Sequence, residues 1–223
     1  MPPPKARASC PPGDPLASNT DSKTAATGLE ALAERARQCT ACPLHTGRTQ
    51  AVFADGSATA RIMFVGEAPG VDEDRQGVPF VGRAGQLLTR IIENAMGMAR
   101  ADVYICNVVK CRPPGNRNPD LAEQQACSHF LEAQVRLVEP ALILTLGKVA
   151  TLFLIDSDLS ITRMRGRVWD YEGIPVVPTW HPAYLLRNEG AKKETWQDVK
   201  LALRTLGLPD APPPWKPESK LVP

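Results

Sequence analysis

The stretch Ile62-Met63-Phe64-Val65-Gly66-Glu67-Ala68-Pro69-Gly70 decides the fold class of this 223-residue chain. Its first four residues are apolar and suit a buried strand, and the glycines and proline that follow suit a tight loop. Three further β-rich runs lie at Val103 to Val109, Ala141 to Leu146 and Ile174 to Val177, and helical patterns separate the first three runs. This alternation is typical of α/β proteins. We predict a three-layer α/β/α sandwich with a central, mostly parallel four-stranded sheet.

Hydrophobic spacing places the helices of this domain. They are predicted at Leu29 to Gln38, Ala84 to Met96, Pro119 to Val138, Lys148 to Leu154 and Lys192 to Leu206, while Arg163 to Tyr171 suits either a strand or a loop. Asn118 before Pro119 suits an N-cap followed by a first-turn proline. Residues 1–27 and 209–223 are rich in proline and show no hydrophobic periodicity, so we predict two disordered tails around one domain at 28–208.

Composition limits the classes of function. Hydrophobic residues make up 43% of the chain, but no apolar run reaches the ~20 residues of a membrane-spanning helix. No apolar segment of a secretory signal follows Met1, so we expect a cytoplasmic protein that does not use a membrane. Six cysteines in a reducing compartment favour metal binding, catalysis or burial over disulfides. A net charge of only +2 means that a nucleic-acid partner requires a local basic patch.

Three loops follow the predicted strands and are expected at one rim of the sheet. Ligands of open α/β sheets bind outside the carboxyl ends of the strands. The loops read Gly66-Glu67-Ala68-Pro69-Gly70, then Asn107 with Lys110-Cys111-Arg112-Pro113-Pro114, then His181-Pro182-Ala183-Tyr184-Leu185-Leu186-Arg187. Taken singly they suit a tight turn, a strand-end cap and a half-buried histidine. Their joint occurrence favours a binding site.

At these loops the sequence resembles the bacterial and archaeal family 4 uracil-DNA glycosylases, over about Leu29 to Leu206. The matching runs are 66–70, Gly77-Val78-Pro79-Phe80-Val81-Gly82-Arg83-Ala84-Gly85-Gln86-Leu87-Leu88, 107–114 and 181–186. The resemblance implies an enzyme that flips uracil out of single- or double-stranded DNA and hydrolyses its N-glycosidic bond. An abasic site remains, which is the first step of base excision repair. The resemblance also implies one 4Fe-4S cluster.

The predicted uracil pocket combines residues from all three loops. The Asn107 amide can donate to uracil O4 and accept from N3–H, a pattern that cytosine reverses. By resemblance Phe80 stacks on the flipped base, although a core phenylalanine is the competing interpretation. His181 is the expected donor to O2, where negative charge develops as the bond breaks. Gly66 and Ala68 complete the predicted substrate-binding set.

Glu67 is the candidate catalytic anion. It can orient the attacking water, stabilise the positive charge on the sugar, or exclude the methyl group of thymine, and the sequence does not rank these roles. The better-known branch of the superfamily has an aspartate at the place of Ala68. The family 4 enzymes lack this aspartate, as this chain does. The base that activates water therefore stays open.

Four cysteines are candidate metal ligands. Cys39-Thr40-Ala41-Cys42 places two thiols on one turn, Cys111 follows the second strand, and Cys127 lies in the next predicted helix. Spacing alone leaves zinc, a cluster or plain burial open. The resemblance assigns Cys39, Cys42, Cys111 and Cys127 to the cluster. Cys10 and Cys106 match no ligand of the family.

Basic and apolar residues near the rim are candidate DNA contacts. The predicted phosphate and duplex contacts are Lys110, Arg112, Arg163, Arg165, Arg187, Tyr184 and Leu185, with Arg117 and Arg167 as further candidates. Solvated arginines and core packing of the apolar residues are the competing interpretations. We expect a monomer whose partner is uracil-containing DNA.

Three other functions are alternatives. A related branch traps DNA covalently through a histidine in a basic insertion, but residues 112–119 contain no insertion and no histidine. A DNA-binding module without chemistry would lack the asparagine, the phenylalanine or the histidine of the pocket, but all three are present here. A shift towards hypoxanthine or xanthine stays open.

Overall fold

The computed structural model describes residues 22–209. Within them, a six-stranded sheet has the order β1-β3-β2-β4-β6-β5. The strands are β1 (Ala54–Gly56), β2 (Ile62–Gly66), β3 (Tyr104–Asn107), β4 (Leu142–Leu146), β5 (Trp169–Tyr171) and β6 (Ile174–Thr179). β3, β2, β4 and β6 are parallel neighbours, whereas β1 and β5 pair antiparallel at the two edges.

The parallel four-stranded centre confirms the predicted α/β class, but the total of four strands was wrong. Both missed strands are three residues long and only partly buried. Their residues 54–56 and 169–171 carry little apolar periodicity, so pairing with a stronger neighbour rather than local sequence makes them strands. β5 lies inside the segment that had been left open between strand and loop.

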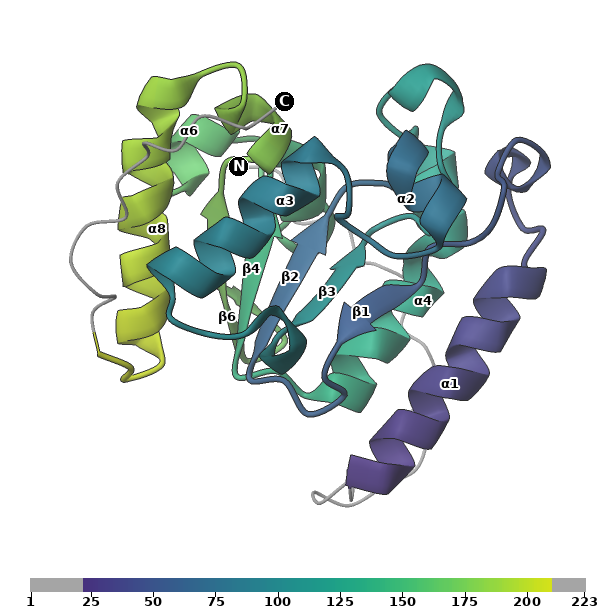
Figure 1. Cartoon of the computed structure of the whole chain (residues 1–223), viewed down its shortest axis with the longest axis horizontal. Helices are drawn as coiled ribbons and strands as arrows, with labels where there is room; N and C mark the ends of the chain where they lie inside the picture. Colours follow the sequence, from purple (N-terminus) through teal and green to yellow (C-terminus); the bar gives the residue numbers. More distant parts are fainter. Residues whose placement is uncertain (1–21, 210–223) are drawn as a thin grey trace, which may run out of the picture.

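Helices cover both faces of the sheet (Figure 1). The helices of the described residues are α1 (Ser22–Gln38), α2 (Val71–Gln76), α3 (Arg83–Arg90), α4 (Leu121–Val138), α5 (Lys148–Leu154), α6 (Ile161–Met164), α7 (Pro182–Leu185) and α8 (Lys192–Thr205), with short helical turns η1 (Pro43–Thr46), η2 (Ile91–Ala95), η3 (Arg100–Asp102), η4 (Pro114–Asn116) and η5 (Glu189–Ala191). None of these helices is long and apolar enough to cross a membrane.

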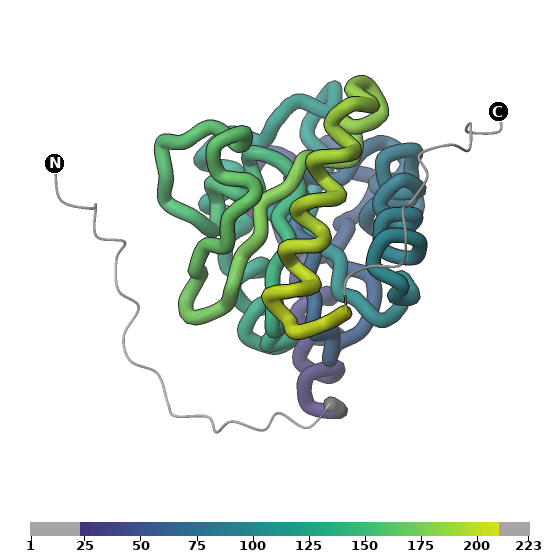
Figure 2. The backbone as a smooth tube through the Cα atoms, turned by 90° about the vertical axis from the view of Figure 1, so that its left-hand side faces the viewer, coloured from purple at the N-terminus to yellow at the C-terminus, as the bar shows by residue number. Residues whose placement is uncertain are grey.

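The side chains of β2 alternate between two hydrophobic cores. Met63 and Val65 pack with residues of α1, α4 and α5 on one face, and Ile62 and Phe64 pack with residues of α3 and α8 on the other. A central strand buried on both faces therefore needs an unbroken apolar run, which is the pattern of 62–65. Figure 2 shows α8 along the outside of the second core. The predicted three layers are confirmed.

Two helix boundaries differ from the prediction. α1 begins at Ser22, inside the segment 1–27 that had been predicted as a disordered tail. α4 begins at Leu121, and its N-cap is Asp120 rather than Asn118. The Asp120 carboxylate accepts from the Glu123 N–H at 2.8 Å, and the Glu123 carboxylate accepts from the Asp120 N–H at 2.9 Å. This reciprocal cap satisfies two helix-end donors, so it sets the start of α4.

Candidate active site

A cavity of about 490 Å³ lies beyond the carboxyl ends of β2, β3 and β6. This volume is within the usual range of small-molecule sites. Its walls come from all three predicted loops, from the segment between α2 and α3 with the adjoining helix turns, and from the loop before α4. The lining residues are Glu67, Ala68, Pro69, Gly70, Glu73, Phe80, Ala84, Asn107, Pro113, Asn116, Arg117, Asn118, His181, Ala183, Tyr184 and Arg187. The structure thus brings Glu67, Ala68, Phe80, Asn107 and His181 together.

Gly66, the last residue of β2, allows the floor of the cavity to form. A Cβ atom at Gly66 would overlap with both Asn107 Oδ1 and the Phe80 ring. The Asn107 amide and the Phe80 ring therefore approach one point on the backbone. Asn107 is only 1% exposed, and its Oδ1 has no hydrogen-bond partner among the described residues. A buried acceptor without a partner is costly unless a ligand supplies a donor.

The Phe80 loop is held by the carboxylate of Glu73. Phe80 has a left-handed backbone with φ of 54°, which a bulky residue adopts only when its surroundings enforce it. Glu73 accepts hydrogen bonds from the N–H groups of Val81 and Gly82 at 2.9 Å each, and from Gly70 at 3.1 Å. One side chain thus ties the 66–70 loop to the Phe80 loop. Sequence reasoning missed Glu73, because Asp72-Glu73-Asp74 resembles a solvated acidic run.

His181 is held as a neutral imidazole. It precedes α7, and its Nδ1 accepts a hydrogen bond from the Ala183 N–H at 3.2 Å. Burial, with the charge of Arg187, lowers the pKa of His181 to about 4. A neutral ring whose Nδ1 is an acceptor carries its proton on Nε2. His181 therefore offers an N–H donor, and its ring centroid lies 5.7 Å from that of Phe80.

Two carboxylates line the cavity, but their environments differ. Glu73 is committed to three backbone N–H groups, as above. Glu67 is half-buried, and among the described residues no hydrogen bond or ion pair to its carboxylate is found. Burial raises the pKa of Glu67. Glu67 is thus the carboxylate available for chemistry.

A second, smaller cavity lies between α1, η1 and α4. Its lining includes Cys39, Cys42, Cys111 and Cys127, so the structure gathers the four predicted ligands. The Arg48 guanidinium donates to Cys111 Sγ at 3.0 Å. Among residues 22–209, no three His, Cys, Asp or Glu side chains converge as ligands of one metal ion would. Thiols that surround a cluster lie further apart than the ligands of a single ion.

Lys110 does not lie on the DNA-facing surface, and this prediction was wrong. The residue is 1% exposed. Its Nζ donates to the Asn107 carbonyl and to Gln134 Oε1, each at 2.6 Å. Sequence reasoning gave no role to Gln134, because a glutamine inside an amphipathic helix has no distinctive signal. Lys110 was predicted to contact DNA because a lysine in a loop has no sequence signal that marks it as buried.

Leu185 is fully buried in the α3–α8 core, so its predicted contact with DNA is also wrong. Its neighbour Tyr184 does line the cavity, and its ring stacks on Trp180 with centroids 4.6 Å apart. Successive side chains of a helix are about 100° apart, so Leu185 can face the core while Tyr184 faces the cavity. Of Tyr184 and Leu185, both predicted to contact DNA, only Tyr184 lines the cavity.

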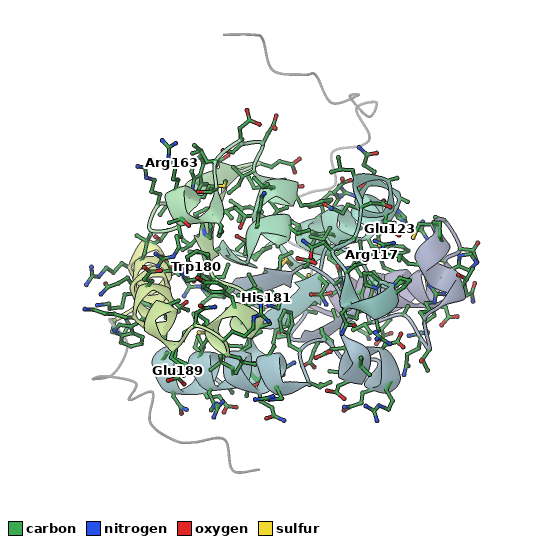
Figure 3. All side chains as sticks on the ribbon, turned by 90° about the horizontal axis from the view of Figure 1, so that it is seen from above. Arg117, Glu123, Arg163, Trp180, His181 and Glu189 are labelled. Carbon is green, nitrogen blue, oxygen red and sulfur yellow. The ribbon has the colours of Figure 1, made fainter. Side chains whose placement is uncertain are left out.

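The predicted arginines occupy different positions. Arg187 lines the cavity, and Arg112 is partly exposed, with its Nε bonded to Asn116 Oδ1 at 2.8 Å. Arg163 is exposed but lies at the outer margin in Figure 3, which looks onto the carboxyl ends of the strands, whereas His181 lies near the middle. Arg165 is largely buried and pairs with Asp198 at 2.9 Å and with Glu194 at 3.3 Å. Its predicted role as a free phosphate contact is therefore not retained.

Arg117 was only a further candidate, yet it lines the cavity. It pairs with Glu123 at 2.6 Å, so its position depends on the cap of α4. Figure 3 shows the pair on one side of His181 and Trp180 on the other.

The fold defines an α/β domain whose cavity lies beside a neutral histidine, and comparisons identify its class. The model of the uracil DNA glycosylase superfamily matches residues 53–200, so the chain belongs to that superfamily.

Within it, the relatives define the particular family. A type-4 uracil-DNA glycosylase of Thermotoga maritima is 53% identical over 162 residues, which are 72% of this chain and 84% of the relative. One of Sulfurisphaera tokodaii is 45% identical over 180 residues, 77% and 82% of the two chains. A type-5 uracil-DNA glycosylase of Pyrobaculum aerophilum is 30% identical over 151 residues, 60% and 66%. The chain belongs to the type-4 uracil-DNA glycosylases.

Proposed function

We propose that this chain excises uracil from single- or double-stranded DNA by hydrolysing the N-glycosidic bond, and so starts base excision repair. One observation carries the proposal: within residues 22–209, Asn107 Oδ1 is buried without a hydrogen-bond partner, in the cavity that Phe80 and His181 also line. The N3–H of uracil supplies the missing donor. The family membership supports the same substrate.

Recognition of the base follows from the chemistry of the Asn107 amide. Its oxygen accepts from N3–H, and its NH₂ donates to O4. Cytosine has an acceptor at N3 and a donor at C4, so both groups would be left unpaired in a buried site. Such mismatches reject a wrong substrate by roughly 10⁴-fold or more. Stacking on Phe80 contributes about 1–3 kcal/mol without regard to base identity. Asn107 therefore provides the specificity.

Bond cleavage uses His181 and Glu67 in separate roles. The departing base gains negative charge at O2, and the Nε2–H of His181 is the donor for it. Because the imidazole is already neutral and held by Ala183, it needs no reorganisation as charge develops. We assign to Glu67 the anion beside the sugar, since the other carboxylate of the cavity is committed to the backbone. Gly66 and Ala68 keep the space above β2 open.

We also propose that Cys39, Cys42, Cys111 and Cys127 bind one 4Fe-4S cluster. Four thiols around one cavity fit its ligand set, and the Arg48 guanidinium complements the negative charge of a bound thiolate. Burial raises the pKa values of the Cys42, Cys111 and Cys127 thiols. A metal that binds the deprotonated thiols offsets this cost. The group would supply a cross-link that ties α1 and the 111–119 loop to α4.

Arg187, Arg112, Arg163 and Tyr184 remain the proposed DNA contacts, and Arg117 joins them. We retain the proposals of a monomer, of a cytoplasmic location and of one catalytic domain. We move the start of this domain from the predicted residue 28 to residue 22, because α1 is continuous from Ser22. The remainder of the predicted tails lies outside the described residues.

The test is an excision assay with matched oligonucleotides that contain uracil, thymine, cytosine or hypoxanthine, followed by alkaline cleavage at abasic sites. We expect cleavage at uracil in single and double strands, and none at thymine or cytosine. Equal rates on uracil and hypoxanthine would instead favour the broader substrate range. No cleavage at uracil by iron-loaded protein would refute the proposed function.

A further inference from the structure

Lys110 is a buried cation that the proposed chemistry does not use. Its side chain is among the largest that are fully buried in the described chain. An ammonium group taken out of water is costly unless its donors are satisfied. The two recorded acceptors of Lys110 Nζ are neutral: the Asn107 carbonyl and Gln134 Oε1, both at 2.6 Å. The contacts of Lys110 Nζ are thus hydrogen bonds to a backbone carbonyl and a side-chain amide, not an ion pair.

Gln134 is itself fixed, so it can direct the lysine. It is 0% exposed, and its NH₂ donates to Tyr104 Oη at 3.0 Å and to the Phe53 carbonyl at 3.2 Å. These bonds settle the orientation of the amide, because its oxygen must then face Lys110. Lys110 thus bonds to α4 through Gln134 and to the end of β3 through the Asn107 carbonyl.

The Asn107 carbonyl belongs to the last residue of β3. β3 ends at Asn107, and the N–H groups of Val108 and Val109 turn back to the carbonyls of Gly66 and Glu67. Those bonds anchor the amide side of this segment to the β2 loop. The recorded donor to the Asn107 carbonyl is Lys110. Removal of the ammonium would leave this peptide group without that buried partner.

We propose that Lys110 is a positioning residue for uracil recognition, which holds the Asn107 carbonyl and thereby fixes the base-reading amide. This inference rests on the proposed function. Recognition sites require placement within about 0.5 Å, so a small shift of the Asn107 backbone weakens both hydrogen bonds to uracil. Lys110 also lines the cysteine cavity, so the same side chain bridges the two sites of the molecule.

Three variants separate positioning from general stability. Lys110→Met removes the charge and keeps a long apolar side chain. Gln134→Leu disturbs the same buried cluster but leaves the bond to Asn107. Lys110→Met with Gln134→Leu also removes the Gln134 Oε1 acceptor that Lys110→Met leaves unpaired, and it carries the test if that variant does not fold. Each is made with and without Asn107→Ala. The readouts are single-turnover excision, inhibition by free uracil, iron per chain and the thermal midpoint.

We expect Lys110→Met and the double variant to lose at least tenfold in excision and in affinity for free uracil, with iron retained. Gln134→Leu should lose less excision than Lys110→Met, because it keeps the bond from Lys110 to the Asn107 carbonyl. With Asn107→Ala present, Lys110→Met should cost no more than twofold further.

Two results would overturn the inference while wild-type excision persists. One is a recovery of excision in the double variant together with its thermal midpoint, which would mean a structural role only. The other is an undiminished effect of Lys110→Met when Asn107 is already alanine. An inactive wild-type protein would instead remove the proposed function itself.

Discussion

The rings of Phe80 and His181 lie with their centroids 5.7 Å apart and their planes inclined by 36°, although one precedes α3 and the other precedes α7. A base that stacks on Phe80 therefore has the imidazole within reach of its edge. Asn107 approaches the same ring from β3, as its shared clash with a Cβ at Gly66 shows. The arrangement leads to five predictions.

His181→Ala should slow single-turnover excision by about 10²–10³-fold, the usual loss on removing a preorganised donor at a developing oxyanion. The thermal midpoint should change little, because the side chain makes one hydrogen bond, to the Ala183 N–H. His129→Ala is the matched control, since His129 is exposed on α4. An equal loss in the control would mean that the effect is not specific to the site.

The acid limb of activity should come from Glu67. Burial raises the pKa of Glu67 above its usual 4.5, and the active form is the anion, so activity falls as pH decreases through the raised value. His181 titrates lower, at about 4, and does not set this limb. Rates measured from pH 8 downwards should decline at the acid end for wild type. Glu67→Gln should be slower and flat, and an unchanged acid limb in this variant would contradict the assignment.

Gly66→Ala should close the uracil site. Its Cβ would overlap with Asn107 Oδ1 and the Phe80 ring, so base binding is lost while β2 can still pair. We expect at least a hundredfold loss of kcat/KM on uracil-containing DNA. Gly190→Ala serves as the control, because nothing lies within 4 Å of its Cβ. Near-normal kcat/KM in Gly66→Ala would show that the base binds elsewhere.

Glu73→Gln should impair stacking rather than the chemical step. An amide accepts through one oxygen only, so it cannot replace the carboxylate that holds the N–H groups of Gly70, Val81 and Gly82. The expected loss is up to the stacking energy, about 1–3 kcal/mol. Measured as a double-mutant cycle, it should largely disappear in a Phe80→Ala background. Asp72→Asn, next to Glu73, should have little effect, because its ion pair with Arg75 is exposed.

Cys127→Ala should abolish iron binding and the visible colour of the protein, whereas Cys106→Ala should keep both. Cys127 lines the cysteine cavity, and Cys106 is buried in β3 outside its lining. Iron analysis and absorption spectra of anaerobically purified protein give the comparison. Full zinc occupancy in an active wild-type preparation without iron would contradict a cluster.

The sequence by itself determined the parallel centre of the sheet and the loops that carry the site. A strand buried on both faces must be apolar throughout, so the strand at 62–65 could be identified from its unbroken apolar run. The loops at 66–70 and 181–187 were identified because chemistry requires particular side chains there, and such requirements leave long local motifs. The same local logic misplaced the start of α4, because Asn118 and Asp120 are both good caps and only the bond between Asp120 and Glu123 decides between them.

Only the tertiary structure decided which polar residues are buried and what they hold. Lys110 and Arg165 read as surface cations, yet one bonds Asn107 and Gln134 and the other pairs with Asp198. Glu73 was given no role, yet it fixes the loop of Phe80. The physical reason is that the cost of burying a polar group depends on partners that are distant in sequence. Hydrophobic periodicity and short motifs report neighbours along the chain, whereas these contacts exist only after the helices pack on the sheet.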